Sequence, residues 1–433
     1  MELEIVQQSL RTLKRKLRNL LRQVYYQTLF FVEKLPVFGL RLLQPLPFLH
    51  LDRQRLYPPR SVAESSREWV TEAQRTLGLA DAAYVLIDPA EPVHRSTVPK
   101  TCEPTVHPQF QREQEATIPE AFVTIVPQGR VLGEMGTILT PDNQLLLDVS
   151  LDRRRSLNPN QKHLVQMRWP LLPLHRLAGT IAVLATCGSS MYYHWMVDCL
   201  LRYALLGRAG FTVEEIDYFL VDGKGRPYQG ETLALLGIPA EKIIDITDYF
   251  HVQGDRLLVP SYPTLHGQFR SWHLDFLRQS FLPHAADLGD RSGKRLYISR
   301  GKAKIRRIPN EAAIIACLQR YGFQAVQLEN FSFREQVALM AQAEVVLAPH
   351  GSGLTNIIFC QPGTRVIEIF SPELVALYYW KISAVLGLDY YYILGEGYVS
   401  PTGEQSWDAT ADIRVNLENL EQTLALAGIQ PLS

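Results

Sequence analysis

Residues 345–359 read Val-Val-Leu-Ala-Pro-His-Gly-Ser-Gly-Leu-Thr-Asn-Ile-Ile-Phe, an apolar run, a turn with two glycines and a second apolar run. The first four residues predict a buried strand, and residues 354–359 predict a helix that begins directly after the turn. Gly351 and Gly353 would let backbone N–H groups approach an anion closely, and a helix N-terminus adds unpaired donors. The turn is neither a G-x-G-x-x-G nor a P-loop, so it indicates no dinucleotide or Walker-type site. It predicts either a phosphate-binding turn or a glycine pair needed only for packing.

The same alternation of strands and helices continues on both sides of this stretch. Downstream of residue 294, strands are predicted at 295–299, 325–328, 365–369 and 390–393, with helices at 311–321, 333–341 and 373–386. Upstream, strands at 180–186, 216–221, 242–246 and 256–259 alternate with helices at 191–209, 229–236 and 270–281. Repeated strand–helix units bury a parallel sheet between helices, and ligands bind at the carboxyl ends of its strands. The sequence therefore predicts an α/β protein with two Rossmann-like domains that face a cleft.

Changes in composition divide the chain into four parts. Residues 1–60 combine an amphipathic segment with a Pro-rich linker, and residues 61–282 form the first domain. A β-rich lead-in opens this domain, with strands predicted at 121–126, 136–139 and 145–149. Residues 283–294 contain Gly and Asp and few apolar side chains, which is typical of an interdomain linker. Residues 295–433 form the second domain.

The first 60 residues carry a local excess of positive charge. The whole chain has 44 basic and 44 acidic residues, whereas this segment has eleven Lys or Arg and four Asp or Glu, a net charge of +7. Within residues 3–24, apolar side chains recur every three or four positions with basic ones between them, which predicts a basic amphipathic helix. Residues 1–34 either lie on an anionic membrane surface or pack as an ordinary helix on the protein body.

The composition excludes several classes of protein. With 46% hydrophobic residues the chain is neither disordered nor fibrous, and its balanced charge gives no reason to expect a nucleic-acid partner. Five scattered cysteines without a C-x-x-C pair argue against a disulfide framework or a structural zinc site. No secretory signal and no uncharged apolar run of about 20 residues is present. We therefore expect a cytoplasmic protein, either free or peripheral at the inner face of the cell membrane.

One candidate for acid–base chemistry lies at the start of the helix predicted at 191–209. His194 and Asp198 are four residues apart, so they project from one helical face. An imidazole oriented by a carboxylate is suited to remove a proton from a hydroxyl group. Arg202 continues the same face, so an ordinary ion network on the helix surface is the alternative.

A cluster of cations follows the strand predicted at 295–299. Arg300, Lys302, Lys304, Arg306 and Arg307 lie within eight residues, and guanidinium groups match phosphate oxygens well. A solvated basic loop is the alternative. In the same predicted domain, Glu368 is an acid near the end of an apolar strand, where it would bind sugar hydroxyls, cap the next helix or pair with a cation.

The chain contains no D-x-D sequence. An enzyme that releases a diphosphate without this carboxylate pair would stabilise it with arginines and a helix dipole rather than with Mg²⁺ or Mn²⁺. We therefore expect no cofactor and no metal ligand, although the sequence leaves a divalent metal open.

Several motifs occur together in one order. They are Tyr192-Tyr193-His194-Trp195-x-x-Asp198, Leu296-Tyr297-Ile298-Ser299-Arg300 with Arg306-Arg307 and Asn310-Glu311, His350-Gly351-Ser352-Gly353-Leu354-Thr355-Asn356, and Val366-Ile367-Glu368-Ile369. In this combination, across residues 180–375, the chain resembles glycosyltransferase family 61. The chain departs from the family at Met191, where an Asn often stands, which affects the start of the helix.

The resemblance implies a fold, a reaction and roles for residues. The fold would be of the GT-B type, and the reaction an inverting transfer from a nucleotide-sugar, usually a UDP-sugar, to a glycan or lipid-linked acceptor. His194 and Asp198 would lie on the acceptor side as catalytic residues. The nucleotide-sugar would be held by Arg300, Arg306 or Arg307, by the turn of His350, Gly351, Ser352, Gly353, Leu354, Thr355 and Asn356, and by Glu368 near the ribose.

A role in bacterial polysaccharide biosynthesis, such as that of a capsule, fits the lack of a secretory signal best. Two other functions stay open at this point. A polysaccharide pyruvyltransferase resembles the same two-domain plan, and a non-catalytic, membrane-docked scaffold would retain a vestigial nucleotide pocket.

Overall fold

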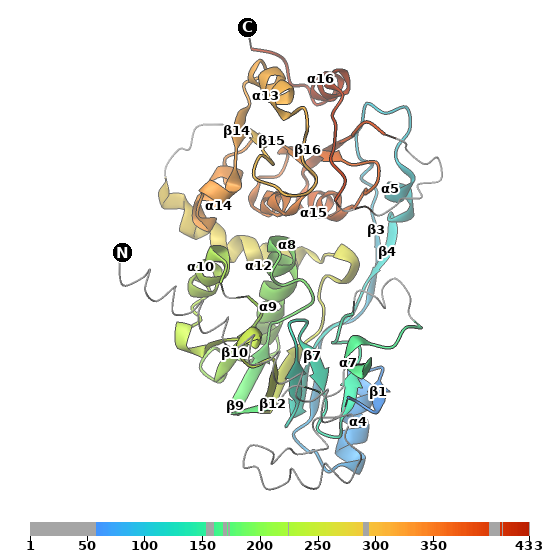
Figure 1. Cartoon of the computed structure of the whole chain (residues 1–433), viewed down its shortest axis with the longest axis vertical. Helices are drawn as coiled ribbons and strands as arrows, with labels where there is room; N and C mark the ends of the chain where they lie inside the picture. The colour runs from blue at the N-terminus through green and yellow to red at the C-terminus, as the bar shows by residue number, and fades with distance from the viewer. Residues whose placement is uncertain are drawn as a thin grey trace, which may run out of the picture.

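The computed structural model describes residues 58–152, 160–167, 171, 174–223, 225–288, 294–397, 408 and 410–432. The sequence features predicted for residues 1–57, including the basic amphipathic helix, lie outside the described residues. Figure 1 shows a lower part built around a first sheet and an upper part built around a second sheet. None of the described helices has the length and apolar character that a membrane span requires.

The first sheet is mixed and has ten strands. They are β1 (Ser61–Ala63), β2 (Ala83–Asp88), β5 (Ala121–Pro127), β6 (Arg130–Leu132), β7 (Thr137–Leu139), β8 (Gln144–Leu146), β9 (His175–Val183), β10 (Tyr218–Val221), β11 (Ile243–Asp245) and β12 (His251–Pro260). The order is β1-β8-β7-β6-β12-β9-β10-β11, and β5 pairs with both β12 and β2. β12, β9, β10 and β11 are parallel neighbours, whereas β5 and β6 run antiparallel to β12. The predicted β-rich lead-in is thus part of the same sheet as the strand–helix units.

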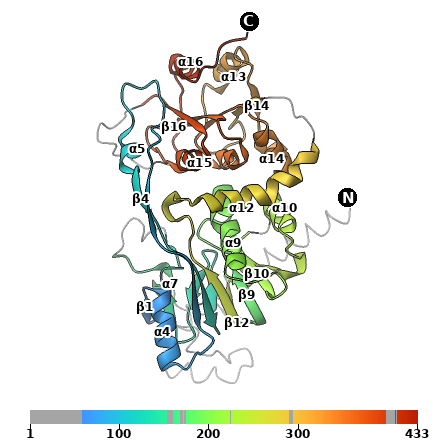
Figure 2. The same ribbon diagram turned by 180° about the vertical axis from the view of Figure 1, so that it is seen from behind.

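Helices pack on this sheet and lead toward the upper part. They are α4 (Ser66–Thr76), α7 (Leu164–Met167), α8 (Tyr192–His194), the π-helix η1 (Trp195–Cys199), α9 (Leu200–Arg208), α10 (Pro227–Leu235), α11 (Ile246–Tyr249) and α12 (Ser271–Phe281), with 3₁₀ turns η2 (Ala240–Lys242), η3 (Leu265–Gly267) and η4 (Leu282–Leu288). In Figure 2, α12 lies across the molecule between the two parts.

The second sheet is wholly parallel and has five strands. They are β13 (Arg295–Ile298), β14 (Gln324–Val326), β15 (Val345–Pro349), β16 (Arg365–Phe370) and β17 (Asp389–Leu394), in the order β14-β13-β15-β16-β17. The helices here are α13 (Glu311–Gln319), α14 (Phe333–Ala341), α15 (Tyr378–Leu386) and α16 (Leu417–Leu426), with 3₁₀ segments η5 (Leu328–Asn330) and η6 (Ser352–Phe359). β15 is buried along its whole length, as expected of a central parallel strand with helices on both faces. The prediction of an α/β fold is confirmed, with parallel pairing throughout the second sheet and among β12, β9, β10 and β11 of the mixed first sheet.

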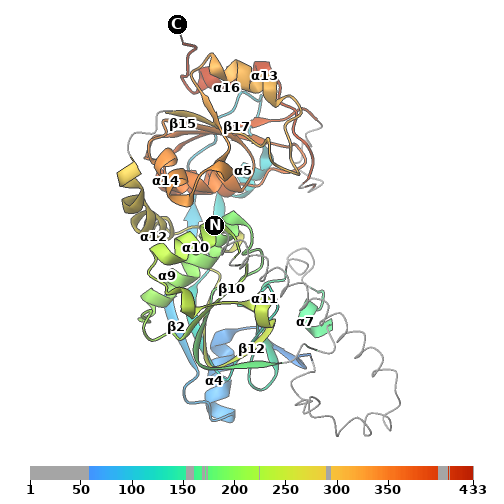
Figure 3. The same cartoon turned by 60° about the vertical axis from the view of Figure 1, so that its left-hand side comes forward.

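A segment far from the second sheet in sequence crosses to it. Residues 89–118, here called the crossing segment, include β3 (Glu91–His94), which pairs antiparallel with β4 (Glu115–Ile118), and α5 (Pro108–Arg112). Figure 3 shows α5 in the upper part, away from the other residues of the N-terminal half. Lys100 forms two backbone hydrogen bonds with the edge strand β17, donating to Tyr390 O (3.1 Å) and accepting from Tyr392 N (3.0 Å). No motif in this segment indicates a role, and the structure places it on the second sheet.

One hydrophobic cluster runs through both parts of the molecule. It contains Phe219 and Leu258 of the first sheet, Leu277 of α12 and Val346 of the second sheet. Two further clusters fill the outer faces, one between the second sheet and helices α13 and α16, the other between the first sheet and α4. The division into domains at residues 61–282, 283–294 and 295–433 stays a prediction, because the core is continuous between the sheets.

Several predicted boundaries differ from the structure. The helix predicted at 373–386 begins only at Tyr378, the segment predicted as a helix at 354–359 is the 3₁₀ segment η6 from Ser352, and part of the predicted linker is the 3₁₀ segment η4. Helix α14, by contrast, begins and ends where it was predicted. Ser332 and Glu335 form a capping box at its start, because the Ser332 side chain accepts from the Glu335 N–H and the Glu335 carboxylate accepts from the Ser332 N–H.

Phe110 anchors the crossing segment, since its ring is 1% exposed and lies edge-on to Trp380, with 5.3 Å between ring centroids. We expect Phe110→Ala to lower the free energy of unfolding by about 3–5 kcal/mol, because it removes a fully buried ring and leaves a cavity. Val98→Ala, in the same segment at a side chain that is 54% exposed, is the matched control and should change it by less than about 0.5 kcal/mol. Urea denaturation measures both, and equal effects would show that the ring anchors nothing.

Candidate functional site

Two of the predicted motifs meet where the two parts of the molecule join. Helix α8 follows β9 and packs against η6, which follows β15. The Tyr192 hydroxyl of α8 donates a hydrogen bond of 2.5 Å to Asn356 Oδ1 of η6. The helix start that carries His194 is thereby held against the glycine turn of residues 350–353. The structure brings together residues that lie more than 150 positions apart in the sequence.

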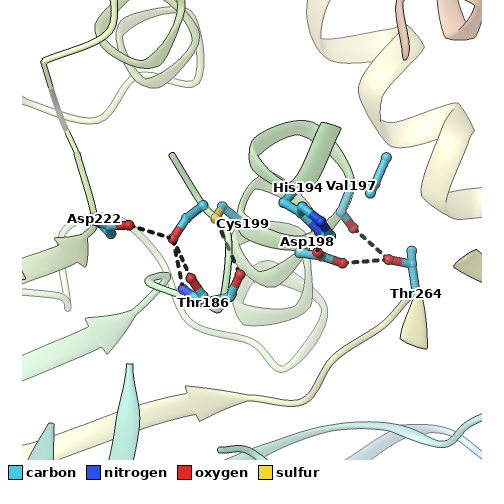
Figure 4. A network of polar contacts seen from close by, with 8 residues as sticks. Thr186, His194, Val197, Asp198, Cys199, Asp222 and Thr264 are labelled. Atoms are coloured by element: carbon cyan, nitrogen blue, oxygen red, sulfur yellow. Dashed lines mark hydrogen bonds and ion pairs between the residues drawn. The ribbon is translucent and has the colours of Figure 1, made fainter. Parts of the chain in front are cut away.

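His194 and Asp198 form the predicted pair. His194 Nδ1 lies 2.7 Å from Asp198 Oδ2, and the imidazole side chain is 28% exposed. A carboxylate only accepts hydrogen bonds, so Nδ1 carries the hydrogen and Nε2 is left as a proton acceptor. The Thr264 hydroxyl donates to the other oxygen, Asp198 Oδ1, at 2.7 Å, which fixes the carboxylate (Figure 4). The pair therefore has the geometry of an oriented general base.

The backbone under this pair is a single π-helical turn. Residues Trp195–Cys199 are π-helical, and the Leu200 N–H bonds back to Trp195 O. Turns of this type are rare and occur frequently at functional sites. Met191, where the family often has Asn, is the N-cap of α8 and makes no side-chain capping bond, so the helix starts without a side-chain cap.

Arg202 takes no part in the His194–Asp198 pair. Its side chain is fully buried and donates to two backbone carbonyls, Ala185 O (2.8 Å) and Ser261 O (3.3 Å). Its guanidinium also lies over the Tyr262 ring, 4.6 Å from the centroid. The alternative of an ion network on the helix surface is therefore wrong.

Arg300 lies directly against the glycine turn. A Cβ atom added at Gly351 would stand 2.2 Å from Arg300 Nη1, so a side chain at this position would displace the guanidinium. The loop itself holds this side chain in place, because Arg300 Nε donates to Arg306 O and Nη2 to Ile305 O. The prediction that Arg300 and the turn belong to one site is in keeping with this contact.

Arg306 also faces the site without a carboxylate partner. Its Nε atom is buried and has no hydrogen-bond partner in the part of the chain that the structure describes, and its backbone has a φ of 51°. Among the described residues, neither Arg306 nor Arg300 forms an ion pair with a carboxylate. Burial lowers the pKa of both guanidiniums, and their mutual repulsion lowers that of Arg300 further. Two half-buried cations that form no direct ion pair among the described residues are suited to bind an anion.

The remaining cations of this loop point elsewhere. Arg307 is bound to Asp412, with Nη2 2.7 Å and Nε 3.1 Å from Oδ2, and its side chain is exposed. Lys302 donates to Asn330 Oδ1, and Lys304 is exposed. The structure thus selects Arg306 from the predicted pair of Arg306 and Arg307, because Arg307 already has a carboxylate partner.

Most side chains of the turn support the fold rather than face a ligand. Leu354 and Thr355 are buried, and a Cβ atom at Gly353 would contact the Leu328 and Ile298 side chains at 3.2 and 3.4 Å. Asn356 accepts from Tyr192 and donates to Gln336 Oε1 (3.0 Å), so its amide is already bound. Ser352, which is half-buried, and the backbone of the turn stay accessible to a ligand.

Glu368 has structural partners on both carboxylate oxygens. Oε1 lies 2.5 Å from His350 Nδ1, and Oε2 accepts from the Tyr390 hydroxyl at 2.5 Å. The carboxylate is completely buried, so the prediction that it contacts a ribose does not agree with the structure. Of the three roles considered for Glu368, the structure agrees with pairing to a group that can carry a positive charge. The partner is a histidine of the same motif, which only the tertiary contact reveals.

Thr264 and Tyr390 are residues of this site that the sequence reasoning missed. Thr264 lies in a loop 66 residues after Asp198, and no pattern around it marks it. Tyr390 begins a run of three tyrosines in a strand, and this run was a usable signal, since a buried phenol needs a hydrogen-bond partner.

A second polar cluster lies at the carboxyl end of β10. Asp222 Oδ2 is 3.5 Å from Ser189 Oγ, which donates to Thr186 O at 2.6 Å (Figure 4). Burial, helped by the charges of Glu134 and Asp245, raises the pKa of Asp222 to about 7. The described residues contain no group of three or more His, Cys, Asp or Glu that could hold a metal ion. The predicted independence of metal stays a prediction.

Comparison with known proteins finds similarity to one family over part of the chain. Residues 192–367, about two fifths of the chain, match the model of the family described as Glycosyltransferase 61. Over 80 residues the chain is 30% identical to an EGF domain-specific O-linked N-acetylglucosamine transferase of Drosophila melanogaster. This aligned stretch covers 18% of this chain and 15% of that protein. Over 64 residues this chain is 34% identical to a beta-1,2-xylosyltransferase of Arabidopsis thaliana, and the aligned stretch covers 15% of this chain and 12% of that protein.

The family model and the names of both relatives are those of glycosyltransferases. The matches span less than a sixth of the length of either relative, so they say nothing of donor or acceptor. The relatives come from an animal and a plant, and they give no support to a bacterial branch.

The raised pKa of Asp222 has a consequence for stability. In the folded chain this carboxyl keeps its proton up to about pH 7, whereas an unfolded Asp loses it near pH 4. The folded state binds more protons in this range, so the contribution of Asp222 to stability is present below pH 4 and is lost as the pH rises through 7. We expect the melting temperature of Asp222→Asn to rise relative to wild type from pH 4 to pH 7. Asp81→Asn, at an exposed residue, is the control and should show no such trend.

Proposed function

We propose that this chain is an inverting glycosyltransferase that moves a sugar from a nucleoside diphosphate donor, a UDP-sugar, to a hydroxyl group of a glycan or lipid-linked acceptor. One observation carries the proposal. The family 61 match coincides with a place where helix α8, which carries the oriented His194, packs against η6, and where Arg300 lies against the glycine turn before η6. A base and a diphosphate-binding group are the two elements that such a transfer needs.

In the proposed reaction His194 acts on the acceptor. Its Nε2 atom accepts the proton of the acceptor hydroxyl while the hydroxyl oxygen attacks the anomeric carbon from the face opposite the leaving group. Asp198 stabilises the imidazolium that forms, and the Thr264 hydroxyl keeps Asp198 in position. The bond between the anomeric carbon and the diphosphate oxygen breaks in the same step, which inverts the configuration.

Arg300 and Arg306 act on the leaving group. The departing diphosphate gains negative charge, and two preorganised guanidiniums stabilise this charge at little reorganisation cost. Both are half-buried, where electrostatic interactions are stronger than in water. Because the loop carbonyls of Ile305 and Arg306 hold Arg300, the side chain does not have to be ordered when the donor binds.

Removing one guanidinium tests the donor site. We expect Arg300→Ala to weaken UDP binding by about tenfold or more, since hydrogen bonds to charged groups contribute roughly 1.5–3 kcal/mol. Arg307→Ala, in the same loop but bound to Asp412, is the matched control and should bind UDP like wild type. Calorimetric titration with UDP, GDP and CMP measures both and identifies the base. Wild-type protein that binds none of these nucleotides would refute the proposed donor class.

Changes at the base should separate chemistry from binding. We expect His194→Gln to lower the transfer rate by about 10²–10⁴-fold while UDP affinity stays within about twofold, because the imidazole contacts the acceptor and not the diphosphate. Asp198→Asn should also lower the transfer rate, since the amide no longer stabilises the imidazolium. Release of UDP from a UDP-sugar is the measurement. His94→Gln, which removes an exposed histidine paired with Glu115, is the control. Unchanged turnover in His194→Gln would remove this residue from the reaction.

A further inference from the structure

The buried pair of His350 and Glu368 takes no part in the proposed transfer step. Strands β15 and β16 are neighbours in the second sheet, with Ala348 opposite Glu368, so the carboxyl end of β15 delivers His350 to this carboxylate. Glu368 is completely buried and His350 is 5% exposed. Among the described residues, Glu368 is the only hydrogen-bond partner of the imidazole, through Nδ1. The second ring nitrogen, Nε2, is therefore available to a ligand.

Aromatic rings fix the orientation of this imidazole. The His350 ring is stacked on Phe370 at 5.5 Å and lies 5.5 Å from the Tyr379 ring, measured between centroids. Tyr390 holds the far oxygen of Glu368, and Phe110 of the crossing segment packs against Tyr390 at 6.3 Å. The rings and hydrogen bonds leave the imidazole little freedom to rotate.

The pair lies next to the arginines of the donor site. Gly351, which Arg300 contacts, is the next residue after His350, and the charge of Arg306 acts on Glu368. The ionisable groups around the pair are Glu368 itself, Tyr378 and Tyr379 beside the imidazole ring, Tyr390 and Arg306, which act on Glu368, and Arg300, which lies against Gly351. Glu368 is the only carboxylate in this set.

The charge of the pair depends on how many protons it holds. One proton lies between Glu368 Oε1 and His350 Nδ1, and with this proton alone the pair carries one negative charge and Nε2 has no hydrogen. A second proton makes the pair neutral overall and turns Nε2 into a donor. Burial raises the pKa of Glu368, in agreement with a pair that resists net negative charge.

We propose that Glu368 is a positioning residue that acts through His350: the pair holds two protons when the donor is bound, and His350 Nε2–H donates to an oxygen of the diphosphate. This inference rests on the proposed function and deepens it, because it adds a third donor to Arg300 and Arg306. It also replaces the role of a ribose ligand that the family resemblance implied for Glu368. A pair with only one proton would repel the diphosphate.

The experiment compares UDP with uridine, which lacks the diphosphate, by calorimetric titration at pH 7.0 and 8.5. The variants are His350→Gln, Glu368→Gln and the double substitution. We expect His350→Gln to weaken UDP binding by about tenfold to hundredfold and to leave uridine binding unchanged. Glu368→Gln should weaken UDP binding by at least about fivefold, and should have no further effect when His350 is already Gln, because it acts only through His350.

The pH dependence tests the second proton. From pH 7.0 to 8.5 the diphosphate keeps a nearly constant charge, since the last phosphate group titrates near pH 6. The ratio of UDP affinity to uridine affinity should fall with rising pH in wild type and stay constant in His350→Gln. A purely structural role of the pair would give no such difference.

Two further variants keep the test decisive. Tyr390→Phe removes only the hydroxyl that holds Glu368, and should weaken UDP binding in the same direction if Glu368→Gln does not fold. His94→Gln removes a histidine that pairs with Glu115 through the same atom types on the protein surface, and should bind UDP like wild type.

The outcomes separate this inference from the proposed function. Wild-type protein that fails to bind any nucleoside diphosphate overturns both. If wild-type protein binds UDP and His350→Gln binds UDP equally well, only the role of the pair is overturned. The same holds if His350→Gln lowers the affinities for UDP and for uridine by the same factor. Additive effects of the two substitutions would show that Glu368 does not act through His350.

Discussion

The site depends on the packing of helix α8 against η6. Each of the two elements follows a buried parallel strand, β9 in the first sheet and β15 in the second, and their contact is closed by the hydrogen bond between Tyr192 and Asn356. Because a parallel strand presents its carboxyl end to a following helix, each sheet contributes one chemical group at this contact. In the proposed function, the first sheet contributes the general base His194 with its partner Asp198, and the second sheet contributes the glycine turn with Arg300. Without this contact neither group would have a partner for transfer chemistry.

The crossing segment adds a second constraint. The chain passes from the first sheet to the second not only at the η4 segment but also within residues 89–118, which run out and return. Lys381 of α15 pairs with Glu113 of this segment at 2.8 Å, and Lys100 extends the edge of β17. Any closing motion of the two parts about residues 283–294 must also move these contacts. The same segment supports the donor site from behind, since Phe110 packs against Tyr390, which holds Glu368.

Among the histidine–carboxylate pairs of the described residues, His194–Asp198 and His350–Glu368 lie in different surroundings, and the surroundings separate their chemistry. The His194 side chain is 28% exposed, so an acceptor hydroxyl can reach it and water can exchange with it. His350 and Glu368 are almost entirely buried among aromatic rings, where net charge is costly. The first pair is therefore suited to accept a proton in each turnover, and the second to keep its protons and donate a hydrogen bond.

The alternation of apolar runs with turns determined the order of strands and helices in the sequence. It located α14 to the residue, because a capping box and a clear apolar period mark that helix, and it located β13 to β17 within about two residues. Spacing alone also determined the pair of His194 and Asp198, since residues four apart on a helix face the same way. These are local properties, which neighbouring residues along the chain decide.

Only the tertiary structure decided which charged residues stay free for a ligand. Arg306 and Arg307 are equivalent in sequence, yet Asp412, 105 residues away, binds Arg307 and leaves Arg306 unpaired among the described residues. Glu368 matched a ribose ligand by position, yet His350 and Tyr390 take both of its oxygens. Lys100 of the crossing segment pairs with Tyr391 of the second sheet, 291 residues further along the chain. The reason is physical: buried charges and open sheet edges are satisfied by whatever the fold brings within hydrogen-bond distance, and sequence separation does not limit that choice.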